Sequence, residues 1–263
     1  MWGVTNEKIY YVNTNEKLPV LMYHHFSDQS SSTSVKPDDF EQQMKYLKDQ
    51  GYTTILVSEL INYTNNNLPL PDKPVLITMD DGYSSNYEYA YPILKELNMK
   101  ATFYVVVDQM GETPGVIEHF SWEQAKEMYE SGLIDIQSHS YNSHSKETIE
   151  NKPLLTYPIH EHETEAQYIQ RIRQDLLLAK EEIEKNLGNE VISFAYPFGS
   201  FNEATEEIAK EVGYQLTLTV RNGINNANDD FFLLNRINVP GGYSGADIVK
   251  EIEKKFYFFG FRF

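Results

Sequence analysis

Two adjacent carboxylates, Asp80 and Asp81, follow the apolar and β-branched run at 75–78. Such a run is typical of a strand that is buried on both faces of a sheet. The two aspartates would then lie at the carboxyl end of that strand, and Gly82 permits a sharp turn after them. Two like charges this close are costly unless a cation or a proton separates their states. Aspartate is also a common turn former and helix cap, so the pair alone leaves both interpretations open.

Two of the seven histidines, His139 and His144, closely follow a later apolar run. A spacing of five places them on neither one helical face nor one strand face, so they converge only if the chain turns between them. By themselves they would be read as surface residues of a loop. With Asp81 they make one carboxylate and two imidazoles, a ligand set suited to Zn²⁺ or a similar divalent ion. Asp80 would then be free to act as the base that activates a water molecule.

The segments that must position these side chains alternate between strand-like and helix-like patterns. Expected strands cover 18–26, 52–57, 75–78, 100–107, 133–139, 191–197, 214–220 and 232–239. Expected helices cover 37–51, 58–64, 88–98, 121–132, 163–187, 202–213 and 244–256. This alternation predicts a mainly parallel sheet with helices outside it, and seven or eight such units favour a barrel. Parallel barrels carry their chemistry at the carboxyl ends of the strands, where the aspartates and histidines are expected.

Composition excludes several classes of protein. The 263 residues suit one large domain, and 39 acidic against 22 basic residues give a formal charge of −17. That charge argues against nucleic acid or an anionic membrane as a partner, and it is compatible with a neutral or cationic ligand. The absence of cysteine excludes disulfides and thiolate zinc sites. No transmembrane segment is expected, and the polar start lacks the pattern of a signal peptide, so we expect either a cytosolic protein or one whose export segment has been removed.

Three motifs resemble those of the polysaccharide deacetylases of carbohydrate esterase family 4. They are TMDDG at 78–82, SHSYNSH at 138–144 and FAYPFG at 194–199. The resemblance implies a distorted (β/α) barrel of about seven parallel strands. This barrel would form a single domain at 18–263, and residues 1–17 would be an N-terminal extension. It implies a metal-dependent hydrolase that removes N-acetyl groups from an N-acetylglucosamine polysaccharide such as chitin, peptidoglycan or poly-N-acetylglucosamine. The segment PVLMYHHF and the histidine spacing look most like the extracellular branch that acts on poly-β-1,6-N-acetylglucosamine, which implies an extracellular or cell-surface location.

The resemblance also implies a role for each motif residue. Asp80 is the catalytic base, and Asp81, His139 and His144 bind one divalent ion, for which zinc is expected first and cobalt, nickel or iron are alternatives. The backbone N–H of Phe198, beside Pro197, would help to hold the oxyanion.

Aromatic residues beside the motifs could bind the sugar. We expect the rings of Tyr83, Tyr141 and Tyr196 to stack on sugar faces.

The sequence departs from the family pattern at two catalytic positions. Ala195 stands where the family usually has an arginine that steadies the catalytic aspartate. Arg236, at the end of another expected strand, could supply that cation, or it could be an ordinary surface salt-bridge residue. The family's late histidine, its general acid, is missing because no histidine follows His162. His24, at the end of the first expected strand, could take that role because histidine suits proton delivery near neutral pH.

Three other histidines and the C-terminal segment are expected to lie outside the catalytic machinery. His25 should point away from His24 and serve a structural role. His160 and His162 could imitate a metal site, but a solvated loop is favoured within the irregular segment at 141–162. The aromatic segment at 256–263 is expected to be a buried final strand, or an interface if it is exposed.

Two rival functions stay open at this stage. Because of the two departures, the chain could be a carbohydrate-binding or scaffolding protein that keeps the fold but has weak or no catalysis. It could also be a metal-dependent amidohydrolase that acts on a small amide.

Overall fold

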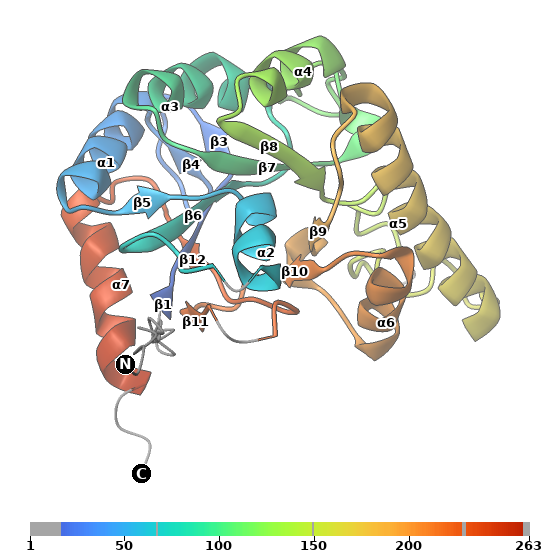
Figure 1. Cartoon of the computed structure of the whole chain (residues 1–263). Helices are drawn as coiled ribbons and strands as arrows, with labels where there is room; N and C mark the ends of the chain where they lie inside the picture. Colours follow the sequence, from blue (N-terminus) through green and yellow to red (C-terminus); the bar gives the residue numbers. More distant parts are fainter. Residues whose placement is uncertain (1–16, 67, 149, 228–229, 260–263) are drawn as a thin grey trace, which may run out of the picture.

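A curled parallel sheet forms the centre of the molecule, and helices surround it (Figure 1). The computed structural model describes residues 17–66, 68–148, 150–227 and 230–259. The order of the sheet is β10-β9-β8-β7-β6-β2-β12, and β5 pairs with the start of β6. These strands are β2 Val20–Tyr23, β5 Thr53–Thr54, β6 Pro74–Met79, β7 Ala101–Val105, β8 Ile134–Ser138, β9 Ser193–Ala195, β10 Leu216–Leu218 and β12 Ile237–Asn238.

The two ends of this sheet nearly meet. A parallel bridge joins Leu218 in β10 to Leu234, which lies just before β12. Since β12 pairs with β2 on its other side, the sheet curls back on itself as an open, distorted barrel. The predicted fold class is therefore confirmed. Two further short pairs lie outside the main sheet: β1 Lys17–Leu18 with β11 Asn225–Asn226, and β3 His25–Phe26 with β4 Ser34–Val35.

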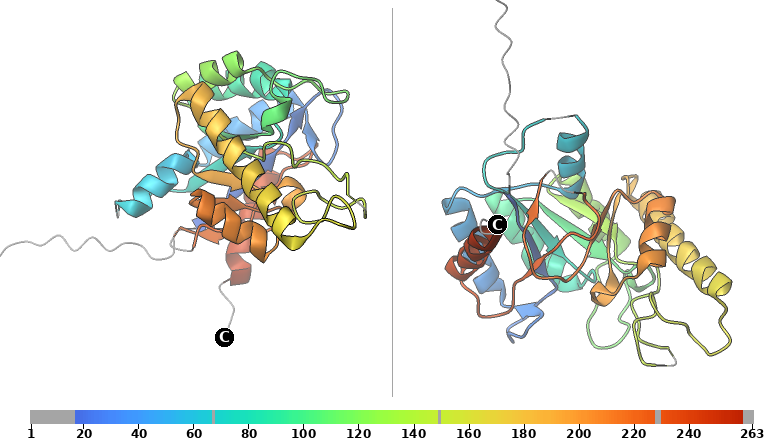
Figure 2. Two further views of the ribbon diagram at one scale, coloured as in Figure 1. Left: turned by 90° about the vertical axis from the view of Figure 1, so that its right-hand side faces the viewer. Right: turned by 90° about the horizontal axis from the view of Figure 1, so that it is seen from below.

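Most of the helices pack around the outside of the strands (Figures 1 and 2). The helix at 57–65 instead lies over the middle of the barrel in Figure 1, and its buried side chains pack with those of the barrel interior. They are α1 Pro37–Asp49, α2 Val57–Asn65, α3 Tyr91–Leu97, α4 Trp122–Glu130, α5 Glu165–Leu187, α6 Glu203–Val212 and α7 Gly245–Phe259. A π-helical turn, Asn86–Ala90, precedes α3, and short 3₁₀ turns cover Val107–Gln109 and Pro197–Gly199. Ser121 caps α4, and its side chain accepts a hydrogen bond from the amide of Gln124.

Side-chain alternation along the strands separates two apolar layers. In β6, Ile77 packs in the layer shared with the helices, whereas Leu76 packs with side chains of the barrel interior. By the same period of two, Thr78 and Asp80 point inward with Leu76. In β8 the equivalent inward positions are Asp135, Gln137 and His139. Along β6 the interior thus changes from apolar to polar toward the carboxyl end, whereas the inward positions of β8 are polar throughout.

Several predicted elements differ from the structure. Of the strand expected at 52–57, only Thr53–Thr54 is strand, and Val57 begins α2. The strand expected at 18–26 is broken into three short pieces, and the first break falls at Pro19, which has no amide to donate to a neighbouring strand. The strand expected at 232–239 is reduced to β12. The final strand expected at 256–263 is wrong for 256–259, which continue helix α7, and residues 260–263 lie outside the described part. The apolar residues of α7 recur at helical spacing, with Ile248 and Ile252 buried, and this period extends the helix into the aromatic segment.

The predicted excursion at 141–162 contains neither helix nor strand among its described residues. Its far end is fastened to α5 by Arg171, whose guanidinium donates to the carbonyls of Leu154 and Tyr157 and pairs with Glu163. His160 and His162 are exposed there, as expected for a solvated loop.

Candidate active site

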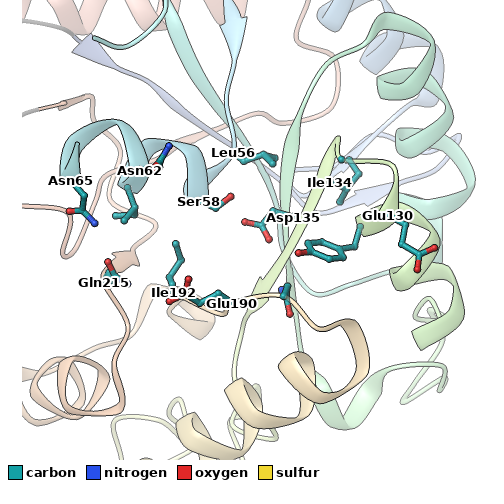
Figure 3. A pocket seen from close by; sticks show the side chains of 14 residues that line it. Leu56, Ser58, Asn62, Asn65, Glu130, Ile134, Asp135, Glu190, Ile192 and Gln215 are labelled. Atoms are coloured by element: carbon teal, nitrogen blue, oxygen red, sulfur yellow. The ribbon is translucent and has the colours of Figure 1, made fainter. Parts of the chain in front are cut away.

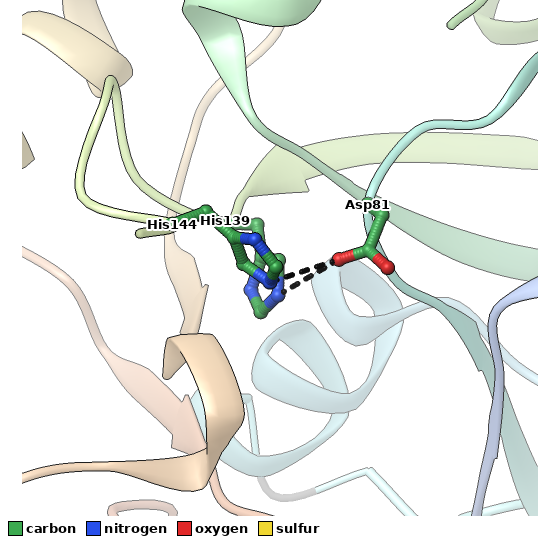
Figure 4. Close-up of side chains that lie close together, drawn as sticks. All are labelled: Asp81, His139 and His144. Atoms are coloured by element: carbon green, nitrogen blue, oxygen red, sulfur yellow. Dashed lines mark ion pairs between the residues drawn. The ribbon is translucent and has the colours of Figure 1, made fainter. Parts of the chain in front are cut away.

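Asp81, His139 and His144 meet at the carboxyl ends of β6 and β8 (Figure 4). Oδ1 of Asp81 lies 3.4 Å from Nε2 of His139 and 3.2 Å from Nε2 of His144. Asp81 has φ of +76°, a left-handed conformation that reverses the strand's alternation and turns its carboxylate toward the two rings. The convergence predicted from the sequence is therefore present.

These three donors fit a divalent ion. Ligand atoms bound to zinc at about 2.0–2.2 Å in a tetrahedron are about 3.3–3.6 Å apart, close to the separations seen here. Oδ1 of Asp81 is buried and has no hydrogen-bond partner among the described residues, which is costly unless a cation occupies the space before it. The Nδ1 atom of His139 lies 2.7 Å from the carbonyl oxygen of Ala195, and this contact fixes the ring with Nε2 toward Asp81.

The ionisation of the two imidazoles differs. Burial and the neighbouring His139 lower the pKa of His144 to about 4, so this ring is neutral at pH 7, as a metal ligand must be. Burial alone would lower the pKa of His139, but the charge of Asp80 and the carboxylate of Asp81 raise it overall. A bound cation would compete with that proton for Nε2.

Asp80 lies beside this cluster and is held by Arg236 inside the barrel. The guanidinium donates to Oδ1 and Oδ2 of Asp80, each over 2.7 Å, and its Nε donates to the carbonyl of Thr219. Arg236 is completely buried, although the sequence also allowed a surface position. Burial would raise the pKa of Asp80, but the charge of Arg236 outweighs it and holds the pKa below its ordinary value. Asp80 is thus an oriented, ionised carboxylate.

His24 lies at the same rim as the two carboxylates. Its charge lowers the pKa of Asp80 and of Asp81, and its Nδ1 is buried without a hydrogen-bond partner among the described residues. The carbonyl of His24 accepts a hydrogen bond from Asn86, which anchors this strand end to the turn after β6. His25 points elsewhere: its Nδ1 lies 2.9 Å from Oγ of Ser85.

The loop between His139 and His144 is held in place by a residue of α5 that the sequence analysis missed. The buried carboxylate of Asp175, in α5, accepts hydrogen bonds from the amides of Tyr141 and Asn142. On the other side, the amides of Val107 and Asp108 donate to the carbonyls of Ser140 and Tyr141. A single inward-facing aspartate in the apolar stripe of a long helix was the only sign of this role in the sequence.

Comparison with known proteins shows the family to which a chain with this site belongs. The family model described as polysaccharide deacetylase matches residues 67–217. The chain belongs to the polysaccharide deacetylase family. YxkH of Bacillus subtilis (strain 168), assigned by name to the same family, is 32% identical over 237 residues, which cover 90% of this chain and 76% of YxkH.

Two further relatives carry more specific names. The poly-β-1,6-N-acetyl-D-glucosamine N-deacetylase of Escherichia coli (strain K12) is 27% identical over 231 residues, 79% of this chain but only 34% of that protein. The solved structure of IcaB from Ammonifex degensii superposes with a TM-score of 0.79 at 30% identity, covering 91% of this chain and 98% of that one. The family resemblance predicted from the motifs is confirmed.

The third family motif places one aromatic side chain at the surface and buries another. Phe198 is exposed, has φ of +56°, and packs its ring 4.5 Å from the ring of His144. Pro197 is buried behind it. Tyr196 is also fully buried, and its hydroxyl donates to Glu206 over 2.5 Å. The expectation that Tyr196 stacks on a sugar is therefore wrong in this structure, because the ring points with Phe194 into the layer beneath the helices.

The other two tyrosines of this family member lie at the site. Tyr83 is half-buried between the rings of His25 and His119, and burial and the Asp81 carboxylate raise its pKa. Tyr141 is half-buried in the loop between the two histidines. Both remain candidates for contact with a sugar.

Proposed function

We propose that this family member is a metal-dependent N-deacetylase that acts on poly-N-acetylglucosamine, with zinc as the ion and β-1,6-linked chains as the first substrate to test. The observation that supports it most directly is the unpartnered Oδ1 of Asp81 between two imidazole nitrogens, beside a carboxylate held by Arg236. The name of the E. coli relative supports the choice of polymer.

In this proposal, different residues carry out different steps of the hydrolysis. The bound ion, held by Asp81, His139 and His144, would supply electrophilic polarisation of the amide and of the attacking water. Asp80 accepts the proton that this water loses as its oxygen adds to the carbonyl carbon. Arg236 keeps Asp80 ionised until it takes this proton, and it fixes the orientation of the carboxylate.

The second half of the reaction needs an acid. When the carbon–nitrogen bond breaks, His24 gives a proton to the sugar nitrogen, which leaves as an amine, and acetate is the other product. The backbone N–H of Phe198 would stabilise the developing negative charge on the carbonyl oxygen, as oxyanion donors do. Its left-handed conformation, which is unusual for a non-glycine residue, supports a functional constraint at this position.

A polymer substrate of this kind favours action outside the cell or at its surface, and that location is part of the proposal. The described residues include no helix with the length and apolar character needed to cross a membrane.

Two alternatives are less well supported. A scaffolding protein without catalysis was suggested by Ala195, but Arg236, just before β12, supplies a cation to Asp80, which weakens that argument. An amidohydrolase for small amides shares the same metal chemistry, and nothing among the described residues around Asp80 favours it.

The decisive experiment is an assay of free amine. The full chain is loaded with Zn²⁺, Co²⁺, Ni²⁺ or Fe²⁺ and incubated with N-acetylglucosamine oligomers of β-1,6 and β-1,4 linkage, with the Asp80→Asn variant as a matched control. We expect amine release that is fastest on the β-1,6 series and lost in the variant. Metal binding without release from any oligomer would favour the scaffolding alternative, and release only from acetamide-sized substrates would favour the small-amide enzyme.

A further inference from the structure

Buried polar groups lie at both ends of the barrel. At the amino end of β8, a cavity of about 750 Å³ lies between α2 and that strand (Figure 3). The buried carboxylate at this cavity, Asp135, has Gln137 and Ser58 as hydrogen-bond donors, so the protein itself supplies its partners. At the carboxyl end, by contrast, His24 and Asn86 carry buried polar atoms without partners among the described residues, beside the proposed catalytic carboxylates.

Asn86 begins the π-helical turn that follows β6, and it is completely buried. In this turn the amide of Tyr91 donates to the carbonyl of Asn86, five residues back instead of the four of an α-helix. Such turns are rare and occur frequently at functional sites. This one begins five residues after Asp81, and its first side chain reaches the strand end that carries His24.

The turn holds the backbone on both sides of His24. The side-chain amide of Asn86 donates to the carbonyl of His24 over 2.6 Å, and Oγ of Ser85 accepts from the amide of Phe26 over 3.1 Å. The same Oγ lies 2.9 Å from Nδ1 of His25, which ties that ring to the turn. Two neighbouring residues therefore fix the strand end from which the His24 ring projects.

The side chains of Asn86 and His24 each keep one buried polar atom unpaired among the described residues. These atoms are Oδ1 of Asn86 and Nδ1 of His24. Because the carbonyl of His24 can only accept, the nitrogen of the Asn86 amide must face it, and Oδ1 is left as an acceptor. A histidine that delivers a proton carries hydrogen on both ring nitrogens, so its Nδ1 is then a donor. Since buried polar atoms are nearly always paired, this acceptor and this donor, on two residues already in contact, are natural partners.

We propose that Asn86 is a positioning residue for His24, whose Nδ1–H donates to Oδ1 of Asn86 directly or through one bridging water. This contact orients the ring so that Nε2 is left to give its proton to the sugar nitrogen. An amide suits the task because it accepts without charge, whereas a third carboxylate beside Asp80 and Asp81 would add like-charge repulsion. The inference deepens the proposed function and rests on the role given there to His24.

Substrates with different leaving groups test this assignment in the zinc-loaded full chain. Asn86→Leu removes both polar atoms of the side chain and keeps its size, whereas the matched control Ser85→Ala weakens the same attachment but keeps Oδ1 of Asn86. We expect Asn86→Leu to lower turnover of an N-acetylglucosamine oligomer about tenfold or more, and turnover of an activated acetate ester less than about twofold. Ser85→Ala should change both activities by the same factor. In a His24→Ala background, Asn86→Leu should cause no further loss on the amide, because the ring that it positions is gone.

NMR of the histidine ring nitrogens tests the hydrogen bond without turnover and without a substitution at Asn86. At a pH where the ring is neutral, we expect His24 of wild type to carry its proton on Nδ1, and His24→Ala assigns the signal by its loss. An unprotonated Nδ1 in neutral His24, additive losses in the double variant, or equal losses of Asn86→Leu on amide and ester would each overturn the assignment. If wild type releases no amine from any oligomer, the proposed function fails, and the NMR signal still decides whether Asn86 holds His24.

Discussion

Arg236 and Asp80 form a bidentate ion pair inside the barrel, although 156 residues separate them in the chain. Both partners are buried, and the guanidinium is also bonded to the carbonyl of Thr219. The pair thus sets both the charge and the orientation of the proposed base. Arg236, the residue before β12, supplies the cation that Ala195 of β9 cannot provide.

Replacement of Arg236 should affect both stability and turnover. Arg236→Met leaves Asp80 buried without its partner, so we expect a loss of about 3–5 kcal/mol in the free energy of unfolding, measured with denaturant. The double variant Asp80→Asn with Arg236→Met should recover part of that loss, because the unpaired charge is gone. Equal stability of Arg236→Met and wild type would show that the pair is not needed to hold the carboxylate.

The proposed division of labour between the aspartates predicts different effects of substitution. Asp80→Asn should lower turnover by about 10² or more while the metal content, measured by atomic emission, stays near that of wild type. Asp81→Asn should lower the metal content as well, because Asp81 supplies a ligand oxygen. If Asp80→Asn loses the metal, the two roles are assigned wrongly.

His24→Ala tests the general acid through the leaving group. Turnover on an unactivated N-acetyl sugar should fall far more than turnover on an activated acetate ester, whose leaving group needs no proton. The metal content should not change. Equal losses on both substrates would indicate that His24 only positions the substrate, and no loss on either would remove it from the mechanism.

Asp175 should control metal affinity without touching the ion. Asp175→Asn cannot accept both amide hydrogen bonds as a carboxylate does, so the loop between His139 and His144 should loosen. We expect a metal affinity about 10–100-fold weaker, by competition with a chelator, and turnover that recovers when metal is in excess. Glu181→Gln, at an exposed position of the same helix, is the matched control. A turnover defect that excess metal does not correct would argue for a different role.

Asp135 should leave a signature in the pH dependence of stability. Burial raises its pKa from 3.8 to about 6, so the folded state binds a proton more tightly than the unfolded chain. Its contribution is therefore most favourable below about pH 4 and is lost as pH rises through 6, by about 2–3 kcal/mol. Asp135→Asn should remove this loss, so its advantage over wild type in denaturant unfolding should grow between pH 4 and 7. Parallel pH profiles would show that Asp135 is solvated.

Much of the site could be predicted from sequence because its residues follow the ends of apolar runs. The rule that parallel strands end at one rim brings Asp81 and His139 to the same edge without knowledge of the packing. The left-handed conformation that turns the Asp81 carboxylate toward the ring is seen only in the structure, because strand alternation would point it the other way. The same alternation pairs Tyr196 with Phe194 on the outer face of β9, so its burial could also have been predicted. We instead expected Tyr196 to face the substrate because it lies within the FAYPFG motif, and that prediction was wrong.

Only the tertiary structure shows those features of the site that depend on contacts between residues far apart in the sequence. Whether Arg236 faces solvent or Asp80 depends on how far the sheet curls, and the bridge between Leu218 and Leu234 is made only when it nearly closes. The role of Asp175 likewise requires α5 to pack beneath the histidine loop. Local sequence fixes strand ends and helical period because both arise from neighbouring residues. Partners of buried charges are set by the global curvature of the sheet, which no local pattern encodes.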